Sequence, residues 1–354
     1  MKIALITDTH FGARNDNLNF NDYFYEFYEK QFFPYLKEHN IKHCVHLGDV
    51  MDRRKFVSYR IAKDFRERFI SQFEGINLHM LVGNHDIYYK NTNDVNSLQE
   101  LVEGKFSNIK VYPEATEVEF DGCKILFVPW INNENYSHTM KMLNTSSAQI
   151  CMGHLELSGF EMTKGQVMIE GWDKENFNRF DMVMSGHFHH KSDDGHIFYL
   201  GTPYQIYWGD YDDPKGFHIF DTETRELERI VNPLTIYSKI YYDDSSSSNI
   251  EHRSKDLSYL KNKYVKLIVV DKKDLYQFDQ YVDRLLQADC YEVKIIEDFS
   301  EMDASNVSDD IVENTQDTMT LLERYIDDLD VNLNKDRLKN TMRTLYTEAQ
   351  DLEI

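Results

Sequence analysis

Five short polar motifs in this chain carry side chains that can bind divalent metal ions. Each contains histidine, aspartate or both, and each directly follows a run rich in aliphatic residues. In chain order the motifs are Asp8-Thr9-His10, Gly48-Asp49-Val50-Met51-Asp52, Gly83-Asn84-His85-Asp86, Gly153-His154 and Gly186-His187-Phe188-His189. Mixed nitrogen and oxygen donors favour Mn²⁺, Fe²⁺ or Zn²⁺ over Mg²⁺. Two such ions roughly 3.5–4 Å apart stabilise the attacking and leaving oxygens of a phosphoryl displacement.

The residues before each motif indicate the elements that position it. Buried strands are predicted at residues 3–7, 43–47, 78–82, 149–152 and 181–185. Residues 23–36 and 57–69 carry apolar side chains at helical spacing, and this alternation of strands and helices predicts an α/β layered domain. Because loops at the carboxyl ends of strands converge in such sheets, we expect the five motifs to meet at one crevice.

This set of motifs resembles that of the calcineurin-like metallophosphoesterase superfamily. Within it, the chain is most similar to nuclease subunits that work with an SMC-like ATPase, such as bacterial SbcD and the recombination endonuclease subunits of T4-like phages. The resemblance covers essentially the whole chain and extends to Gly201-Thr202-Pro203-Tyr204-Gln205. It implies a DNA nuclease that acts as an exonuclease on duplex ends and as an endonuclease on single strands or hairpins, in recombination, repair and replication.

The resemblance also assigns roles to individual residues. It implies two divalent ions, expected to be Mn²⁺, with Asp49 bridging them. The remaining ligands would be Asp8, His10 and His189 for the first ion, and Asn84, His154 and His187 for the second. His85 would contact the phosphate and protonate the departing 3′ oxygen, while Asp86 would orient a histidine. At the position of Asp52, bacterial relatives have aspartate, whereas archaeal and eukaryotic relatives tend to have histidine.

Two other functions are compatible with parts of this pattern. Protein serine/threonine phosphatases have related motifs, but here Arg54 stands where their signature has glycine, and Asp86 where it has glutamate. The paired histidines His187 and His189 also favour the nuclease. The second alternative is a non-catalytic scaffold for the ATPase with a structural metal site. The presence of every expected ligand argues against it.

The resemblance implies four segments with different tasks. These are a metallophosphoesterase β-sandwich flanked by helices over residues 1–232, a small α/β capping domain over 233–298, an acidic linker over 299–310 and an ATPase-binding helix–loop–helix over 311–354. The residues themselves predict a strand at 264–270, a helix at 275–286 and a strand at 291–296. From sequence alone this unit is equally compatible with a dimerisation module.

Two amphipathic stripes follow the linker, and so small a hairpin cannot bury both of them alone. The resemblance implies that the stripes bind the coiled coil of an SbcC-type ATPase, within a heterotetramer that contains a homodimer of this chain. The residues predicted for this contact are Leu322, Tyr325, Ile326, Leu338, Met342 and Leu345. The alternative is that the helices pack on their own chain.

Charge and composition limit the partners and the cellular compartment that can be expected for this chain. The net charge of −22 predicts weak DNA affinity for the isolated chain, although residues 1–110 are electrically balanced. Arg53, Arg54 and Lys55 follow the bridging aspartate and are predicted DNA contacts, with a solvated helix face as the alternative. Tyr204 lies in an aromatic loop predicted to touch substrate or the dimer partner. Four scattered cysteines, no membrane-length apolar run and no signal peptide favour the cytoplasm.

Overall fold

The computed structural model describes residues 1–245, 256–297, 326 and 335. The chain divides into two compact units, Met1–Glu297 and Asp298–Ile354. Of the residues predicted to bind the ATPase, only Ile326 is described, and it is helical and buried. Leu322, Tyr325, Leu338, Met342 and Leu345 lie outside the described residues.

Two six-stranded sheets form the centre of the first unit. The first has the order β14 (Leu227–Asn232), β13 (Lys215–Asp221), β1 (Lys2–Ile6), β2 (His43–His46), β3 (Asn77–Leu81) and β4 (Ile109–Tyr112). The second has the order β11 (Ser192–Asp193), β12 (Ile197–Tyr199), β10 (Met182–Gly186), β7 (Ile150–His154), β6 (Cys123–Val128) and β5 (Thr116–Phe120). In each sheet four consecutive strands are parallel: β1 to β4, and β12, β10, β7 and β6.

The two sheets pack face to face because their strands are apolar on both sides. Ile3 and Leu5 of β1 share a buried cluster with Phe127 and Met152 of the second sheet. Ala4, on the opposite face of β1, belongs instead to a cluster with the phenylalanine-rich helices. A pattern in which both faces are buried is typical of parallel strands enclosed between layers.

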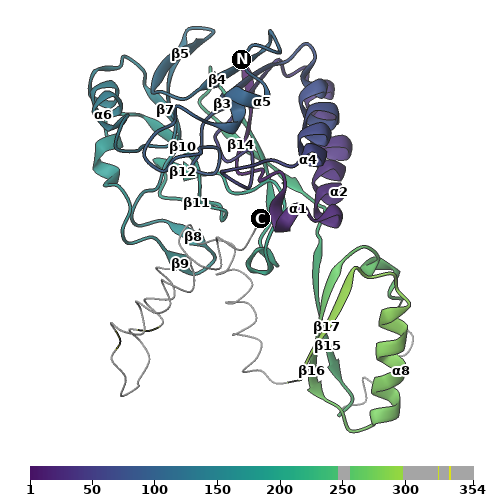
Figure 1. Ribbon diagram of the computed structural model, residues 1–354. Helices are drawn as coiled ribbons and strands as arrows, with labels where there is room; N and C mark the ends of the chain where they lie inside the picture. Colours follow the sequence, from purple (N-terminus) through teal and green to yellow (C-terminus); the bar gives the residue numbers. More distant parts are fainter. Residues whose placement is uncertain (246–255, 298–325, 327–334, 336–354) are drawn as a thin grey trace. The chain divides into compact units, whose positions relative to one another are not determined.

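Helices cover the outer faces of the sheets (Figure 1). The first sheet is covered by α1 (Ala13–Asp16), α2 (Leu18–Phe27), η1 (Tyr28–Phe32), α3 (Phe33–Glu38), α4 (Tyr59–Asp64), η2 (Phe65–Phe69) and η3 (Ile70–Phe73), with α5 (Ser97–Leu101) beside them. The second is covered by α6 (Tyr136–Thr145), whose Leu143 packs with Val183. Shorter elements are β8 (Glu161–Thr163), β9 (Gln166–Val167), η4 (Lys174–Phe177), η5 (Trp208–Asp210) and η6 (Ser258–Leu260). The predicted β-sandwich flanked by helices is confirmed.

A smaller parallel sheet follows, made of β15 (Tyr237–Asp243), β16 (Tyr264–Asp271) and β17 (Glu292–Ile296). Helix α8 (Leu275–Leu286) lies along it and buries Phe278 and Leu285 against Leu267. The predicted strand–helix–strand is therefore present, and β15 is an addition to it. The domain boundaries themselves stay a prediction. Among the described residues, no helix combines the length and apolar character that crossing a membrane requires.

Candidate metal centre

The five motifs meet at the carboxyl ends of the parallel strands. Within the first sheet, the N–H of Asp8 donates to the carbonyl of Gly48 at 3.0 Å, which aligns the loops after β1 and β2. Within the second sheet, the register pairs Gly186 with His154. The two sheets are joined where the N–H of His187 donates to both carboxylate oxygens of Asp8, at 3.1 and 3.0 Å. Strand register and sheet packing therefore bring all five loops to one place.

One group of potential ligands consists of Asp8, His10 and His189. Their ligand atoms all lie within 4.8 Å of one another, and all three side chains are buried. The Nε2 atoms of His10 and His189 are 3.1 Å apart. Two imidazole nitrogens face each other so closely only if a proton or a cation lies between them. These three residues are the set predicted for the first ion.

A second group consists of Asp49, His154 and His187, again with ligand atoms within 4.8 Å. Asn84 joins it, because its Oδ1 lies 2.9 Å from Nε2 of His154 and 3.0 Å from Nδ1 of His187. The Nδ1–H of His154 donates to the carbonyl of Leu47 at 2.7 Å, so Nε2 is the atom directed at the other ligands. Such a backbone hydrogen bond fixes the tautomer of a metal-binding histidine.

Asp49 lies between the two groups. Its Oδ2 is 3.4 Å from Nε2 of His154 and 3.8 Å from Nε2 of His10. Its Oδ1 accepts a hydrogen bond from the backbone N–H of His85 at 2.7 Å. One carboxylate thus contacts both groups, which is the position required of a bridging ligand.

The carboxylates of this cluster stabilise positive charge on two of its histidines. Burial alone would lower the pKa of His10, but the hydrogen bond with Asp52 and the charges of Asp49, Asp52 and Asp8 raise it to about 9. Burial would also lower the pKa of His154, but the charge and hydrogen bond of Asp49, the charge of Asp8 and the hydrogen bond to Leu47 together raise it to about 9. Burial opposes ionisation of Asp49, yet His154 and His85 hold its pKa well below the usual range.

The donor set fits a divalent cation. Nδ1 of His189 and Nδ2 of Asn84 are buried without a hydrogen-bond partner, although buried polar atoms are normally paired. Carboxylate, amide and imidazole groups are concentrated in one buried space. Bound metal ions neutralise the negative charge of clustered carboxylates. They also take the place of the protons that neighbouring histidine nitrogens would otherwise bind.

The backbone at this centre is strained. Asp8, His10, Asp49 and His187 have positive φ angles of 51°, 44°, 55° and 87°. Non-glycine residues in the left-handed region cost about 1–3 kcal/mol each, and they cluster at functional sites. Gly83 is required by close approach, because a Cβ there would lie 2.2 Å from the backbone nitrogen of Asp49. The fold therefore keeps costly conformations at four of the predicted ligands.

Comparison with known proteins identifies the family. The model for calcineurin-like phosphoesterases matches residues 1–191. The chain is 34% identical to Exonuclease subunit 1 of Enterobacteria phage T4 over 355 residues, which is 99% of each chain. This protein belongs to the calcineurin-like phosphoesterase family. It is therefore a metal-dependent phosphoesterase, and the clustered carboxylates and histidines described above are its candidate divalent-metal site.

Two further relatives are more distant. The phosphoesterase is 24% identical to a subunit of the nuclease SbcCD of Staphylococcus saprophyticus over 136 residues, or 35% of this chain and 36% of the relative. It is 16% identical to an archaeal phosphodiesterase of known structure, with a TM-score of 0.32 over 66% of this chain and 100% of the other.

His85 lies at the edge of the metal centre of this phosphoesterase. Its Nδ1–H donates to the carbonyl of Asp52 at 2.5 Å, and its ring centroid is 4.8 Å from that of His10. The carboxylate of Asp52 lies 3.3 Å from Nδ1 of His10, so Asp52 supports a ligand directly. Burial lowers the pKa of His85, although the charge of Asp49 opposes this. The hydrogen bond fixes the ring through Nδ1, and the contact of His85 with a phosphate stays a prediction.

The predicted role of Asp86 is wrong. Its carboxylate does not orient a histidine but accepts three backbone N–H groups, from Val50 and Met51 at 3.0 Å each and from Gly83 at 2.9 Å. These bonds tie the loop after β2 to the loop after β3. Burial nevertheless raises the pKa of Asp86 to about 7, with the charge of Asp49 adding to the effect. Asp86 thus positions Asp49 and Asn84 through the backbone.

The predicted substrate contact of Tyr204 is also wrong. Its side chain is fully buried, its ring stacks on Phe24 at 4.0 Å, and its hydroxyl donates to the carbonyl of Thr9 at 2.6 Å. Aromatic rings of α2 and η1 enclose it, including those of Phe27 and Tyr28. Tyr204 therefore holds the loop that contains Asp8 and His10, and it is inaccessible to DNA.

Arg53, Arg54 and Lys55 lie on the loop that begins at Asp52. Arg53 forms an ion pair with Asp16, while Lys55 is exposed. Arg54 is partly buried, and burial lowers its pKa against the opposing charge of Asp49. All three residues are thus close in sequence to the metal centre, and their contact with DNA stays a prediction.

Other residues of the site follow from the structure alone. Glu156 lies 3.4 Å from Nε2 of His187, and the ring of Trp130 lies 5.1 Å from the ring of that histidine. Lys215 donates to the carbonyl of His189 at 2.9 Å. Glu156 lies only two positions after His154, so its place near the site could have been predicted from the sequence. Trp130 and Lys215 belong to distant segments, so no local pattern points to them.

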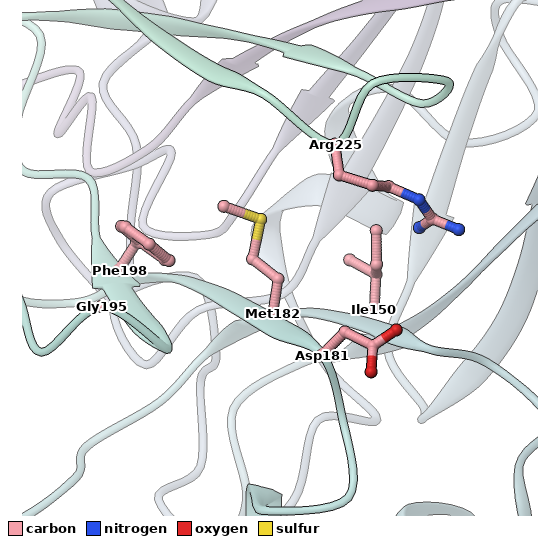
Figure 2. Close-up of a pocket in the computed structure, with 6 residues that line it drawn as sticks. All are labelled: Ile150, Asp181, Met182, Gly195, Phe198 and Arg225. Atoms are coloured by element: carbon pink, nitrogen blue, oxygen red, sulfur yellow. The ribbon is translucent and has the colours of Figure 1, made fainter.

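The structure also contains a small cavity, whose lining residues are shown in Figure 2. Its volume is about 160 Å³, and it is lined by Ile150, Asp181, Met182, Gly195, Phe198 and Arg225. Ile150 and Met182 begin strands β7 and β10, whereas the metal ligands lie at the opposite ends of these strands. The cavity is therefore separate from the phosphoesterase site.

Proposed function

We propose that this phosphoesterase is the nuclease subunit of an ATPase–nuclease complex and that it cleaves DNA with two divalent ions. The observation that carries the proposal is the position of Asp49, whose Oδ2 lies within 3.8 Å of a histidine from each ligand group. A bridging carboxylate between two ligand sets is the arrangement that a two-metal site requires. The full-length similarity to a phage exonuclease subunit supports DNA as the substrate.

In this proposal the chain's own residues bind, orient and transfer protons. The first ion would be held by Asp8, His10, His189 and Asp49, and the second by Asp49, Asn84, His154 and His187. When bound, the ions supply a nucleophile at neutral pH and neutralise charge on the phosphate. His85, fixed by the carbonyl of Asp52, would protonate the departing 3′ oxygen through Nε2.

We assign Mn²⁺ as the working ion. Four of the seven proposed ligands are imidazoles, and imidazole favours transition metals over Mg²⁺. An oxygen-only set would have favoured Mg²⁺ or Ca²⁺.

The proposed partner is an SMC-like coiled-coil ATPase of the SbcC type, in a heterotetramer built on a homodimer of this chain. Both named relatives are called subunits. The net charge of −22 also disfavours tight DNA binding by this chain alone. We infer exonuclease action on duplex ends and endonuclease action on single strands or hairpins, in recombination, repair and replication, with the ATPase controlling access to duplex.

The test is incubation of the purified protein with end-labelled duplex and single-stranded DNA, with Mn²⁺, Mg²⁺ or EDTA and with or without the ATPase. Hydrolysis is expected to require added ion, with Mn²⁺ more effective than Mg²⁺. Undiminished cleavage in EDTA would contradict the two-metal mechanism. Dephosphorylation of a phosphoserine peptide without any DNA cleavage would instead indicate the protein phosphatase alternative. An intact metal site with no hydrolysis of either substrate would indicate a scaffold.

A further inference from the structure

A pair of exposed aromatic side chains lies on the loop that leaves the metal centre. Phe56 is 60% exposed and Tyr59 is 96% exposed, and both lie between Asp52 and the first turn of α4. Single exposed apolar side chains are ordinary, whereas exposed apolar groups that gather beside polar ones mark a contact surface. Phe56 and Tyr59 are three positions apart on one short segment. Packing in the core does not explain either ring.

The backbone of this loop is anchored at both ends. At its start, the N–H of Asp52 donates to the carbonyl of Phe11 at 3.1 Å, and its own carbonyl accepts the hydrogen bond from His85. At its end, the hydroxyl of Ser58 caps α4 by accepting the N–H of Ile61 at 3.4 Å. The side chain of Ile61 is only 1% exposed. A pre-organised surface loses little conformational entropy when a ligand binds.

Cationic side chains neighbour the two rings in the sequence, and two of them also pair with carboxylates, Arg53 with Asp16 and Arg60 with Asp64. The four are Arg53, Arg54, Lys55 and Arg60. The guanidinium of Arg53 lies over the ring of Phe56 at 4.4 Å from its centroid. Lys55 and Arg60 are exposed. In a chain with a net charge of −22, this concentration of positive charge beside the metal centre suits an anionic ligand.

We propose that Phe56 and Tyr59 form a stacking surface for the unpaired bases of single-stranded DNA, whose phosphates are bound by the neighbouring cations. The inference rests on the proposed nuclease function, because it names the substrate class of the same site. A duplex keeps its base faces covered by neighbouring base pairs, so exposed rings discriminate in favour of unpaired bases. Stacking on an aromatic side chain strengthens binding by about 5- to 150-fold per base and tolerates any sequence.

The test compares full-length Phe56→Ala/Tyr59→Ala with the wild type. Affinity is measured by fluorescence anisotropy in EDTA for a labelled single strand of mixed sequence, for an abasic strand with the same number of phosphates, and for a duplex. The variant is expected to bind the base-containing strand at least about fivefold more weakly. Its affinity for the abasic strand and the duplex, and its melting temperature, are expected to be unchanged because both rings are exposed.

Two further variants complete the design. Phe56→Trp/Tyr59→Trp keeps a flat ring at each position and is expected to restore binding. Tyr276→Ala is the matched control, because Tyr276 is a 71% exposed aromatic residue on helix α8, and its loss is expected to change nothing. Lys55→Ala/Arg60→Ala is expected to weaken base-containing and abasic strands equally and to reduce the salt dependence of binding.

Several results would overturn the inference. Equal loss of affinity for base-containing and abasic strands would show that the rings support the loop and do not stack. Unchanged strand binding with loss of the ATPase would make the loop a protein contact. If the wild type cleaves DNA while the aromatic variant binds strands normally, only this inference fails. If the wild type hydrolyses bis(p-nitrophenyl) phosphate but no DNA, the proposed nuclease function fails as well.

Discussion

At the scale of single residues, the proposed mechanism separates groups that would hold metal from groups that would act on substrate. Asp49 contacts histidines of both proposed ligand groups through one oxygen. His85 instead contacts Asp49 through its backbone, and its ring lies beside His10 and Asp52. Substitution of these two residues should therefore have different consequences, although they are hydrogen-bonded to each other.

For His85→Gln we expect metal content near that of the wild type and a large loss of turnover. General acid catalysis typically contributes about 10²–10⁴-fold, and glutamine has no proton of suitable acidity to donate. The measurement is the rate of DNA cleavage in Mn²⁺ together with metal analysis of the dialysed protein. If the variant lost its metal, His85 would be a ligand and the assigned role would be wrong.

For Asp49→Ala we expect loss of metal as well as activity. The substitution removes the carboxylate beside both His10 and His154, leaving two buried histidines without one of the charges that raise their pKa values. Metal analysis and the shift of melting temperature on adding Mn²⁺ report the loss, since a bound ligand stabilises the folded state. A normal Mn²⁺-dependent shift in this variant would rule out a bridging role.

At the scale of elements, the sequence predicted the strands that end in polar motifs. Strands such as β1 and β2 are short aliphatic runs, and parallel strands buried on both faces require that pattern. Edge strands such as β14 and β15 mix exposed and buried residues, so their sequences lack the continuous aliphatic run by which the other strands were predicted. The burial of Tyr204 and the hydrogen bonds of Asp86 depend on contacts between distant segments, which a local pattern does not contain.

Lys215 of β13 shows how an unpredicted element supports the centre. Its ammonium group lies 2.6 Å from Asp210 Oδ1 and 2.8 Å from Asp213 Oδ2, and it donates to the carbonyl of His189. All three charged side chains are buried. Asp210 also accepts the backbone N–H of Tyr207, whose ring stacks on His189. Lys215 is therefore a positioning residue, because it holds the backbone of His189.

For Lys215→Met we expect a loss of about 3–5 kcal/mol in the free energy of unfolding, because removing one partner leaves buried carboxylates uncompensated. We also expect weaker Mn²⁺ binding, since His189 loses a support of its backbone. Denaturant titration and Mn²⁺ titration measure the two effects. Lys174→Met is the control, because Lys174 pairs with Asp194 at the surface, where such pairs contribute about 0–1 kcal/mol. Equal stability of both variants would contradict the supporting role.

At the scale of the whole molecule, the phosphoesterase fold explains how a phosphate ester can be hydrolysed. It does not explain how access of the substrate to the centre is controlled. The metal ligands end at His189, and more than half of the acidic excess lies in the later part of the chain. An acidic chain gains DNA affinity most simply from a partner that contributes positive charge and closes around the substrate. The amphipathic stripes near the carboxyl end are the segment whose sequence best fits such a contact.

For full-length Leu322→Asp/Leu345→Asp we expect loss of co-purification with the SMC-like ATPase and loss of ATP-stimulated cleavage of duplex. Each substitution would place a charge in a predicted apolar interface, where an unpaired charge is costly. Mn²⁺-dependent cleavage of short single strands should persist, because neither residue belongs to the metal centre. Thr320→Asp/Thr344→Asp adds the same charges off the predicted stripes and should bind the ATPase normally. Undiminished binding by the leucine variant would refute docking through these stripes, whereas its insolubility would show that the helices pack on their own chain.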